Sequence, residues 1–156
     1  TKIAHIAGTE HLSFTQQRLK GYLAALEKHD LPVREEWIIF SGFSQQCGEN
    51  DMERLLNLQD VPDAVFSVND RKGVGAIIAM KRRGVKVGKE IGIVGFTNDP
   101  ISTIIEPSLT TIEEPAIDIG KKSCELLLKH IRNILFLPKG LILPGVLIER
   151  ESSMKW

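Results

Sequence analysis

The chain has 156 residues, which is enough for one domain and too few for two of ordinary size. Its 20 Lys and Arg residues equal its 20 Asp and Glu residues, so no excess positive charge exists to attract a nucleic-acid backbone. With two isolated cysteines and no apolar run near the roughly 20 residues that span a bilayer, the composition excludes a disulfide scaffold and a membrane-spanning helix.

Short apolar runs alternate with segments of helical periodicity over the first two thirds of the chain. In chain order the pattern predicts a strand at 2–7, a helix at 13–29, a strand at 36–40, a helix at 49–58, a strand at 64–68, a helix at about 70–83 and a strand at 91–96. Pro32 and Pro62 separate helices from the strands that follow them. This order predicts an α/β fold: a three-layer, open, mainly parallel sheet with helices on both faces.

The last third of the chain continues the pattern less regularly. It predicts a strand at 109–112, a long helix from Pro115 to about residue 131, an irregular apolar stretch at 133–144 and a strand at 146–150.

Polar and aromatic side chains gather where the predicted strands end. Carboxyl ends of parallel strands meet at one edge, where such folds bind ligands. Arginine, amide groups and aromatic rings together fit a neutral, hydroxyl-rich ligand such as a sugar. Two of these residues keep a structural alternative, since Arg18 is equally explained as a solvated helix residue and Asn69 as a helix cap. The candidate ligand-binding residues are Phe14, Arg18, Phe43, Asn69, Thr97 and Asn98.

Catalytic motifs are absent from the sequence. There is no GxxxxGK[ST] phosphate loop, no GxSxG elbow and no HExxH metal motif. Gly73-Val74-Gly75 begins like a dinucleotide fingerprint, but Ile78 stands where the third glycine is needed. Glu113-Glu114 is better explained as a carboxylate pair before a helix N-terminus. We expect a binding protein with no cofactor and no metal, not an enzyme.

Several ordered motifs resemble the LacI/GalR family of transcriptional repressors. They are FSVNDRKGVGAIIAM at 66–80, GVKVGKEIGIVGF at 84–96, PSLTTIEE at 107–114 and LPGVLIERESS at 143–153. Their order and spacing extend the resemblance over residues 2 to 153, which makes the joint pattern far more specific than any single motif.

The resemblance implies a type I periplasmic-binding-protein-like fold, in which a ligand lies between two subdomains joined by three crossovers. It implies that residues 1–156 are a truncated effector-binding domain. The C-terminal subdomain would comprise about 1–112 and 144–153, and the helix at about 115–131 would belong to the missing N-terminal subdomain. The DNA-binding headpiece would be absent, so operator DNA would be bound only through it.

The same resemblance assigns roles to individual positions. Arg18 matches the family's sugar-hydroxyl arginine, Asn69 its ligand-binding asparagine and Phe43 its aromatic platform, while Phe14 occupies a position that often lines the pocket. Thr97, followed by Asn98, stands where many members carry a sugar-binding aspartate. A dimer interface is expected at Val74, Ile77, Ile101 and Ile104.

The implied function is a ligand-responsive, DNA-binding transcriptional regulator of the LacI type, cytoplasmic and homodimeric. Its effector would be a sugar or sugar derivative. The alternative is a periplasmic sugar-binding protein of a transport or sensing system, which would share the fold and differ in its N-terminal segment.

Overall fold

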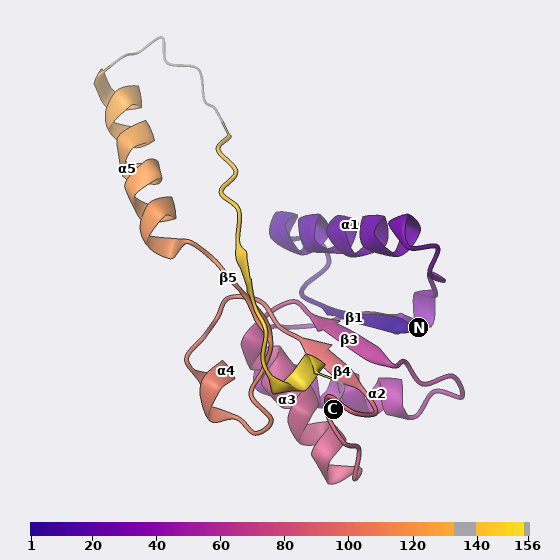
Figure 1. The fold of residues 1–156 in the computed structure, drawn as a ribbon. Helices are drawn as coiled ribbons and strands as arrows, with labels where there is room; N and C mark the ends of the chain where they lie inside the picture. Colours follow the sequence, from indigo (N-terminus) through magenta and orange to yellow (C-terminus); the bar gives the residue numbers. More distant parts are fainter. Residues whose placement is uncertain (133–139, 155–156) are drawn as a thin grey trace.

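A parallel sheet forms the centre of the molecule (Figure 1). The computed structural model describes residues 1–132 and 140–154, so 133–139 of the predicted irregular stretch lie outside the described residues. The strand order is β2-β1-β3-β4, and every neighbouring pair is parallel. The elements are β1 (Ile3–Ala7), α1 (Ser13–Lys28), β2 (Ile38–Phe40), α2 (Gln45–Leu56), β3 (Ala64–Ser67), α3 (Asp70–Arg82) and β4 (Gly92–Val94). The predicted parallel α/β architecture is confirmed.

Helices α2 and α3 cover one face of the sheet. Because side chains alternate along a strand, every second residue of β1, β3 and β4 faces these helices. The resulting core is continuous and almost fully buried. Its main members are Ala4, Ile6, Val65 and Ile93 from the strands and Met52, Leu55, Val74, Ile77 and Met80 from the helices.

Helix α1 lies on the opposite face, above β1. The Tyr22 hydroxyl donates to the Ile3 carbonyl oxygen at 2.7 Å, which fixes the helix on the sheet. Beneath it the His5 ring stacks on Phe66 with centroids 4.7 Å apart, and burial lowers the pKa of His5 to about 4. His5 is therefore neutral at pH 7.

Two helices of the core approach each other through glycines. A Cβ atom on Gly48 of α2 would collide with the backbone carbonyl of Lys72, and a Cβ on Gly75 of α3 would collide with that of Gln45. Any side chain at either position would therefore separate α2 from α3 and open the core beneath them.

The end of the chain forms a ribbon and a projecting helix. Strand β5 (Thr111–Glu113) pairs antiparallel with β6 (Val146–Ile148), and a bridge from Val94 to Thr110 joins the start of this ribbon to β4. Helix α5 (Ala116–Arg132) follows β5, has no buried residue and stands away from the sheet in Figure 1. Shorter elements are η1 (Glu35–Trp37), α4 (Ile101–Ile104) and η2 (Glu151–Ser153). No helix among the described residues is both long and apolar enough to cross a bilayer.

Two expectations need correction. Helix α2 begins at Gln45 and not at residue 49, because the Ser44 hydroxyl caps it by accepting from the Cys47 backbone N–H at 3.2 Å. Val74 and Ile77 are only 2% and 0% exposed, so they pack in the core of their own chain and offer no surface to a partner. The expected dimer interface is thereby reduced to Ile101 and Ile104.

Gly75→Ala is expected to lower the free energy of unfolding by about 2–3 kcal/mol, because the added methyl group forces α2 and α3 apart. Gly21→Ala in α1 is the matched control, since its Cβ would meet no atom within 4 Å and alanine favours helix. Urea denaturation of both variants measures the difference. Equal stability of the two would show that the glycine contact does not limit packing.

Candidate ligand-binding site

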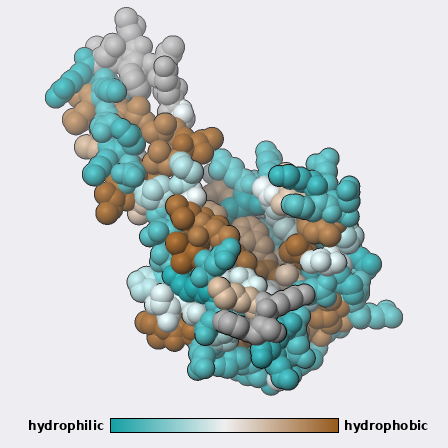
Figure 2. All heavy atoms as spheres, in the orientation of Figure 1, coloured by the Kyte–Doolittle hydropathy of each residue, from teal (hydrophilic) through white to brown (hydrophobic). Residues whose placement is uncertain are grey.

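The carboxyl ends of β1 to β4 meet at one edge of the sheet, where a first hollow, which runs along α1, has one of its ends and a second hollow opens. One has a volume of about 740 Å³ and runs between α1 and the exposed part of the sheet, where Figure 2 shows a recess with an apolar floor. The other has a volume of about 540 Å³ and is lined by Phe43, Ser44, Asn69, Arg71, Thr97 and Asp99. Phe14 lines the first hollow and Phe43 the second, and their ring centroids are 5.4 Å apart. The two hollows therefore meet at this pair of rings.

Arg18 is the best-held of the predicted ligand-binding residues. Its guanidinium lies over the Phe96 ring, 3.9 Å from the centroid. One N–H group donates to the Val68 carbonyl at 2.7 Å and another to the Glu114 carboxylate at 3.0 Å. Burial lowers the pKa of Arg18 while Glu114 opposes that shift, and an arginine stays protonated throughout. The remaining N–H groups, with no partner among residues 1–132 and 140–154, are available to a ligand.

Aromatic rings border this arginine. Phe14 is 41% exposed, and the centroid of its ring lies 5.5 Å from the Arg18 guanidinium carbon. The ring of Phe43 packs against Gly8 so closely that a Cβ at Gly8 would collide with it. The absence of a side chain at Gly8 thus lets the Phe43 ring occupy the end of β1, where it lines the second hollow.

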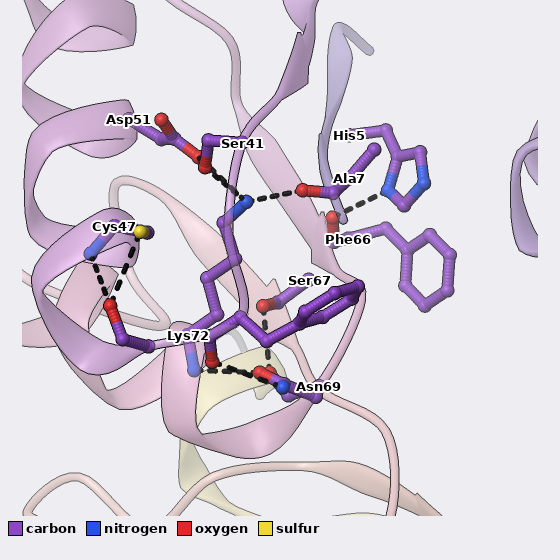
Figure 3. Close-up of polar contacts among 11 residues, drawn as sticks. His5, Ala7, Ser41, Cys47, Asp51, Phe66, Ser67, Asn69 and Lys72 are labelled. Carbon is purple, nitrogen blue, oxygen red and sulfur yellow. Dashed lines mark hydrogen bonds and ion pairs between the residues drawn. The ribbon is translucent and has the colours of Figure 1, made fainter. Parts of the chain in front are cut away.

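The side chain of Asn69 makes two hydrogen bonds within the fold, so few of its hydrogen-bonding positions remain for a ligand. Its Oδ1 accepts from the Lys72 backbone N–H at 2.8 Å, which caps α3, and its Nδ2 donates to the Phe43 carbonyl at 3.2 Å (Figure 3). The cap that the sequence left as an alternative is therefore present, although Asn69 also lines the second hollow.

Thr97 and Asn98 form a turn after β4 in which both φ angles are positive. The φ of +113° is strained for the β-branched Thr97, whereas +50° is a value that asparagine adopts more readily than most residues. Thr97 lines the second hollow, but the Asn98 Oδ1 accepts from Arg150 at 2.8 Å. Thr97 thus lies where a ligand role requires it, while the oxygen of Asn98 is held by Arg150.

Asp70 holds this turn in place, a role that the sequence did not indicate when it placed this residue at the end of a strand and the start of a helix. Its carboxylate is fully buried and accepts from the Thr111 hydroxyl at 2.6 Å and from the Asp99 backbone N–H at 2.7 Å. Burial raises the pKa of Asp70, against the effect of these hydrogen bonds. The residue joins α3, the turn after β4 and strand β5.

A buried ion pair, which no local sequence pattern indicates, lies beneath the edge. The side chains of Lys72 and Asp51 are 0% and 4% exposed, and their charged atoms lie 2.7 Å apart (Figure 3). Lys72 also donates to the Ser41 hydroxyl at 2.8 Å and to the Ala7 carbonyl. Burial lowers the pKa of Lys72, and Asp51 opposes that effect. The pair joins α3 and α2 to the ends of β1 and β2.

The arrangement offers hydrogen-bond donors, acceptors and aromatic faces. Within the described ranges, no group of three or more His, Cys, Asp or Glu side chains is placed to hold a metal ion. An arginine, an amide and phenylalanines beside a hollow at the carboxyl edge of a parallel sheet are typical of small-molecule sites in the doubly wound α/β class of folds.

Comparisons with known proteins agree with that class and narrow it. Residues 1–153 match the family described as the periplasmic binding protein-like domain. The chain is 35% identical over 131 residues to the HTH-type transcriptional repressor CytR of Escherichia coli, which covers 84% of this chain and 38% of CytR. The chain belongs to the periplasmic-binding-protein-like family, in the branch of LacI-type regulators.

Solved structures give the same result. A LacI-type putative transcriptional regulator from Bacillus cereus subsp. cytotoxis aligns with a TM-score of 0.93 at 31% identity, over 97% of this chain and 54% of that one. The complex of the transcriptional regulator CelR with cellobiose aligns with a TM-score of 0.91 at 30% identity, over 97% and 46%. The chain thus spans about half or less of the length of these relatives.

Asp51→Ala is expected to lower the free energy of unfolding by about 3–5 kcal/mol, because it leaves the Lys72 ammonium buried without a counter-charge. The double variant Asp51→Ala/Lys72→Met removes both charges and should recover most of that loss. Denaturant titration of the three proteins distinguishes them. A single variant as stable as the parent would mean that Lys72 is neutral in the folded state.

Proposed function

We propose that this chain is part of the effector-binding domain of a ligand-responsive, DNA-binding transcriptional regulator whose effector is a sugar or sugar derivative. The single observation that carries the proposal is Arg18, fixed over Phe96 with unused N–H groups at the carboxyl edge of the sheet. Family membership and the repressor relatives support regulation over the alternative, a periplasmic transport or sensing protein. The proposed protein acts in the cytoplasm, binds without catalysis and needs no cofactor.

The proposed effector contacts both hollows. Arginine N–H groups donate to hydroxyl oxygens, while a pyranose ring stacks on Phe14 or Phe43. Asn69 and Thr97 add weaker polar contacts from the second hollow. The CelR complex holds cellobiose, which supports a carbohydrate ligand in this branch of the family.

A second lobe completes the proposed site. In this proposal, residues 1–112 and 144–153 form one subdomain, and α5 packs in the other. Helix α5 supports this assignment, because it has large exposed apolar side chains that soluble proteins rarely leave uncovered. These side chains are Ile117, Ile119, Leu127, Leu128 and Ile131. Operator DNA is contacted by a headpiece outside residues 1–156, which accords with the zero net charge of this chain.

Effector binding would reach the headpiece by favouring one arrangement of the two lobes. Thr97 lines the second hollow, and its backbone N–H donates to the Ile112 carbonyl of β5 at 2.8 Å. Because β5 leads directly into α5, a ligand that shifts the turn also shifts the connection between the lobes.

Arg18→Ala in the full-length protein should abolish the response of operator binding to effector, because the main hydroxyl donor is lost, while effector-free operator binding stays within about twofold. Fluorescence anisotropy of labelled operator DNA against a panel of sugars measures both. Arg83→Ala is the control, since Arg83 pairs with Glu53 on the surface at the end of α3. Normal release of DNA by Arg18→Ala would refute the proposed site.

We also propose a homodimer that uses Ile101 and Ile104. Ile104 is 79% exposed on α4, which fits a residue covered by a second copy in a two-fold symmetric interface. Ile104→Asp should convert the full-length dimer to monomer in sedimentation velocity, because a carboxylate would be desolvated there. Val33→Asp, at an exposed valine far from α4 in sequence, should not. A dimer that survives Ile104→Asp would place the interface elsewhere.

A further inference from the structure

The cations at the ligand-binding edge share one property: each is paired with a carboxylate. Arg18 pairs with Glu114 at 3.0 Å, Arg71 with Asp99 at 3.4 Å, and Lys72 with Asp51 at 2.7 Å. Of the described residues that line the two hollows or lie directly beneath them, no Lys or Arg is without such a partner. This edge of the sheet therefore presents no uncompensated positive charge to a ligand.

Of these three ion pairs, the pair of Arg18 and Glu114 is the one that a ligand in the larger hollow would contact. Both residues line the larger hollow, beside Phe14 and Phe96. The Glu114 side chain is 39% exposed, and one of its oxygens accepts from Arg18. Its second oxygen has no partner in the part of the chain that the structure describes, so it is free to accept from a bound molecule.

Glu114 is not needed to hold Arg18. The guanidinium is already fixed by stacking on Phe96 and by its bond to the Val68 carbonyl, two contacts that do not involve Glu114. A neutral residue at position 114 would therefore leave the arginine in place and free its charge for an anionic ligand. The Glu114 carboxylate instead compensates the charge of Arg18 and disfavours an anionic ligand.

We propose that Glu114 is a specificity-determining residue that makes the site select an uncharged polyhydroxyl ligand over its phosphorylated or carboxylated counterparts. This inference rests on the proposed effector site and names the class of its ligand.

The chemistry of the pair fits two neighbouring hydroxyl groups. One hydroxyl accepts from an unused N–H group of Arg18, and its neighbour donates to the free oxygen of Glu114. The dianion of a phosphate monoester accepts from Arg18 but has no proton to donate to Glu114, and the charge of any phosphate, ester or inorganic, is repelled by the carboxylate in the same hollow. The hydroxyl groups of a neutral sugar thus form hydrogen bonds with both Arg18 and Glu114, while the phosphate group of a sugar phosphate forms them with Arg18 only.

The test compares phosphate binding by the full-length protein and its Glu114→Gln variant. Glutamine keeps the shape of the side chain and removes the charge, so the affinity for inorganic phosphate should rise by at least about tenfold. Isothermal titration calorimetry at constant ionic strength measures it. Glu113→Gln is the matched control: it removes a neighbouring exposed carboxylate that has no bond to Arg18, and it should leave phosphate affinity unchanged. Equal phosphate affinity in the parent and in Glu114→Gln would overturn the proposal.

A second measurement separates this inference from the proposed function. The parent protein on operator DNA is titrated with a panel of sugars, each beside its own phosphate ester. Release by parent sugars and not by their esters supports both proposals. Release by an ester alone supports the regulator and overturns the selection by Glu114. A gain of phosphate binding in Glu114→Gln, with no release by any sugar, supports the charge selection and counts against the sugar-responsive regulator. If Glu114→Gln melts well below the parent, the comparison of sugars and esters on the parent protein decides the proposal by itself.

Discussion

The buried carboxylate of Asp70 is the interaction on which the ligand-binding edge depends. It lies at the first residue of α3 and binds the Thr111 hydroxyl on β5 and the Asp99 backbone N–H after the strained turn. The turn with the strained backbone of Thr97 is held in place by these bonds and by Arg150, which binds Asn98. Three segments distant in the sequence are thereby fixed around one side chain, and the hollow beside them takes its shape from that arrangement.

Most of the fold could be predicted from the sequence, because its determinants are local and repeated. Apolar runs and helical periodicity located the four parallel strands and three helices between them, and only their ends differed. The start of α2 was missed because Ser44 caps the helix ahead of its first apolar residue. Val74 and Ile77 were misplaced for a different reason: the resemblance places their helix at a dimer interface, but these two side chains face the core of their own chain.

The site was less predictable, because it depends on contacts between distant residues. Phe14, Arg18, Phe43, Asn69 and Thr97 line the two hollows, whereas the Asn98 oxygen is held by Arg150. The partners of these residues had no local signal. A lysine within a helix is normally solvated, so nothing about position 72 indicated a buried ion pair with Asp51. Glu114, 96 residues from Arg18, was explained by its neighbouring proline and not by the arginine that it binds.

The ribbon of β5 and β6 has a mechanical consequence for the helix at its end. Two-stranded ribbons span a wide range of twist, so a change at the base of this ribbon can reach its end as a rotation. Helix α5 has 17 residues and is therefore about 25 Å long. As a rigid lever of that length, it converts a twist of about 10° at its base into a displacement of about 4 Å at its tip. A small rotation around Asp70 and Thr97 would therefore become a displacement of several ångströms at the far end of α5.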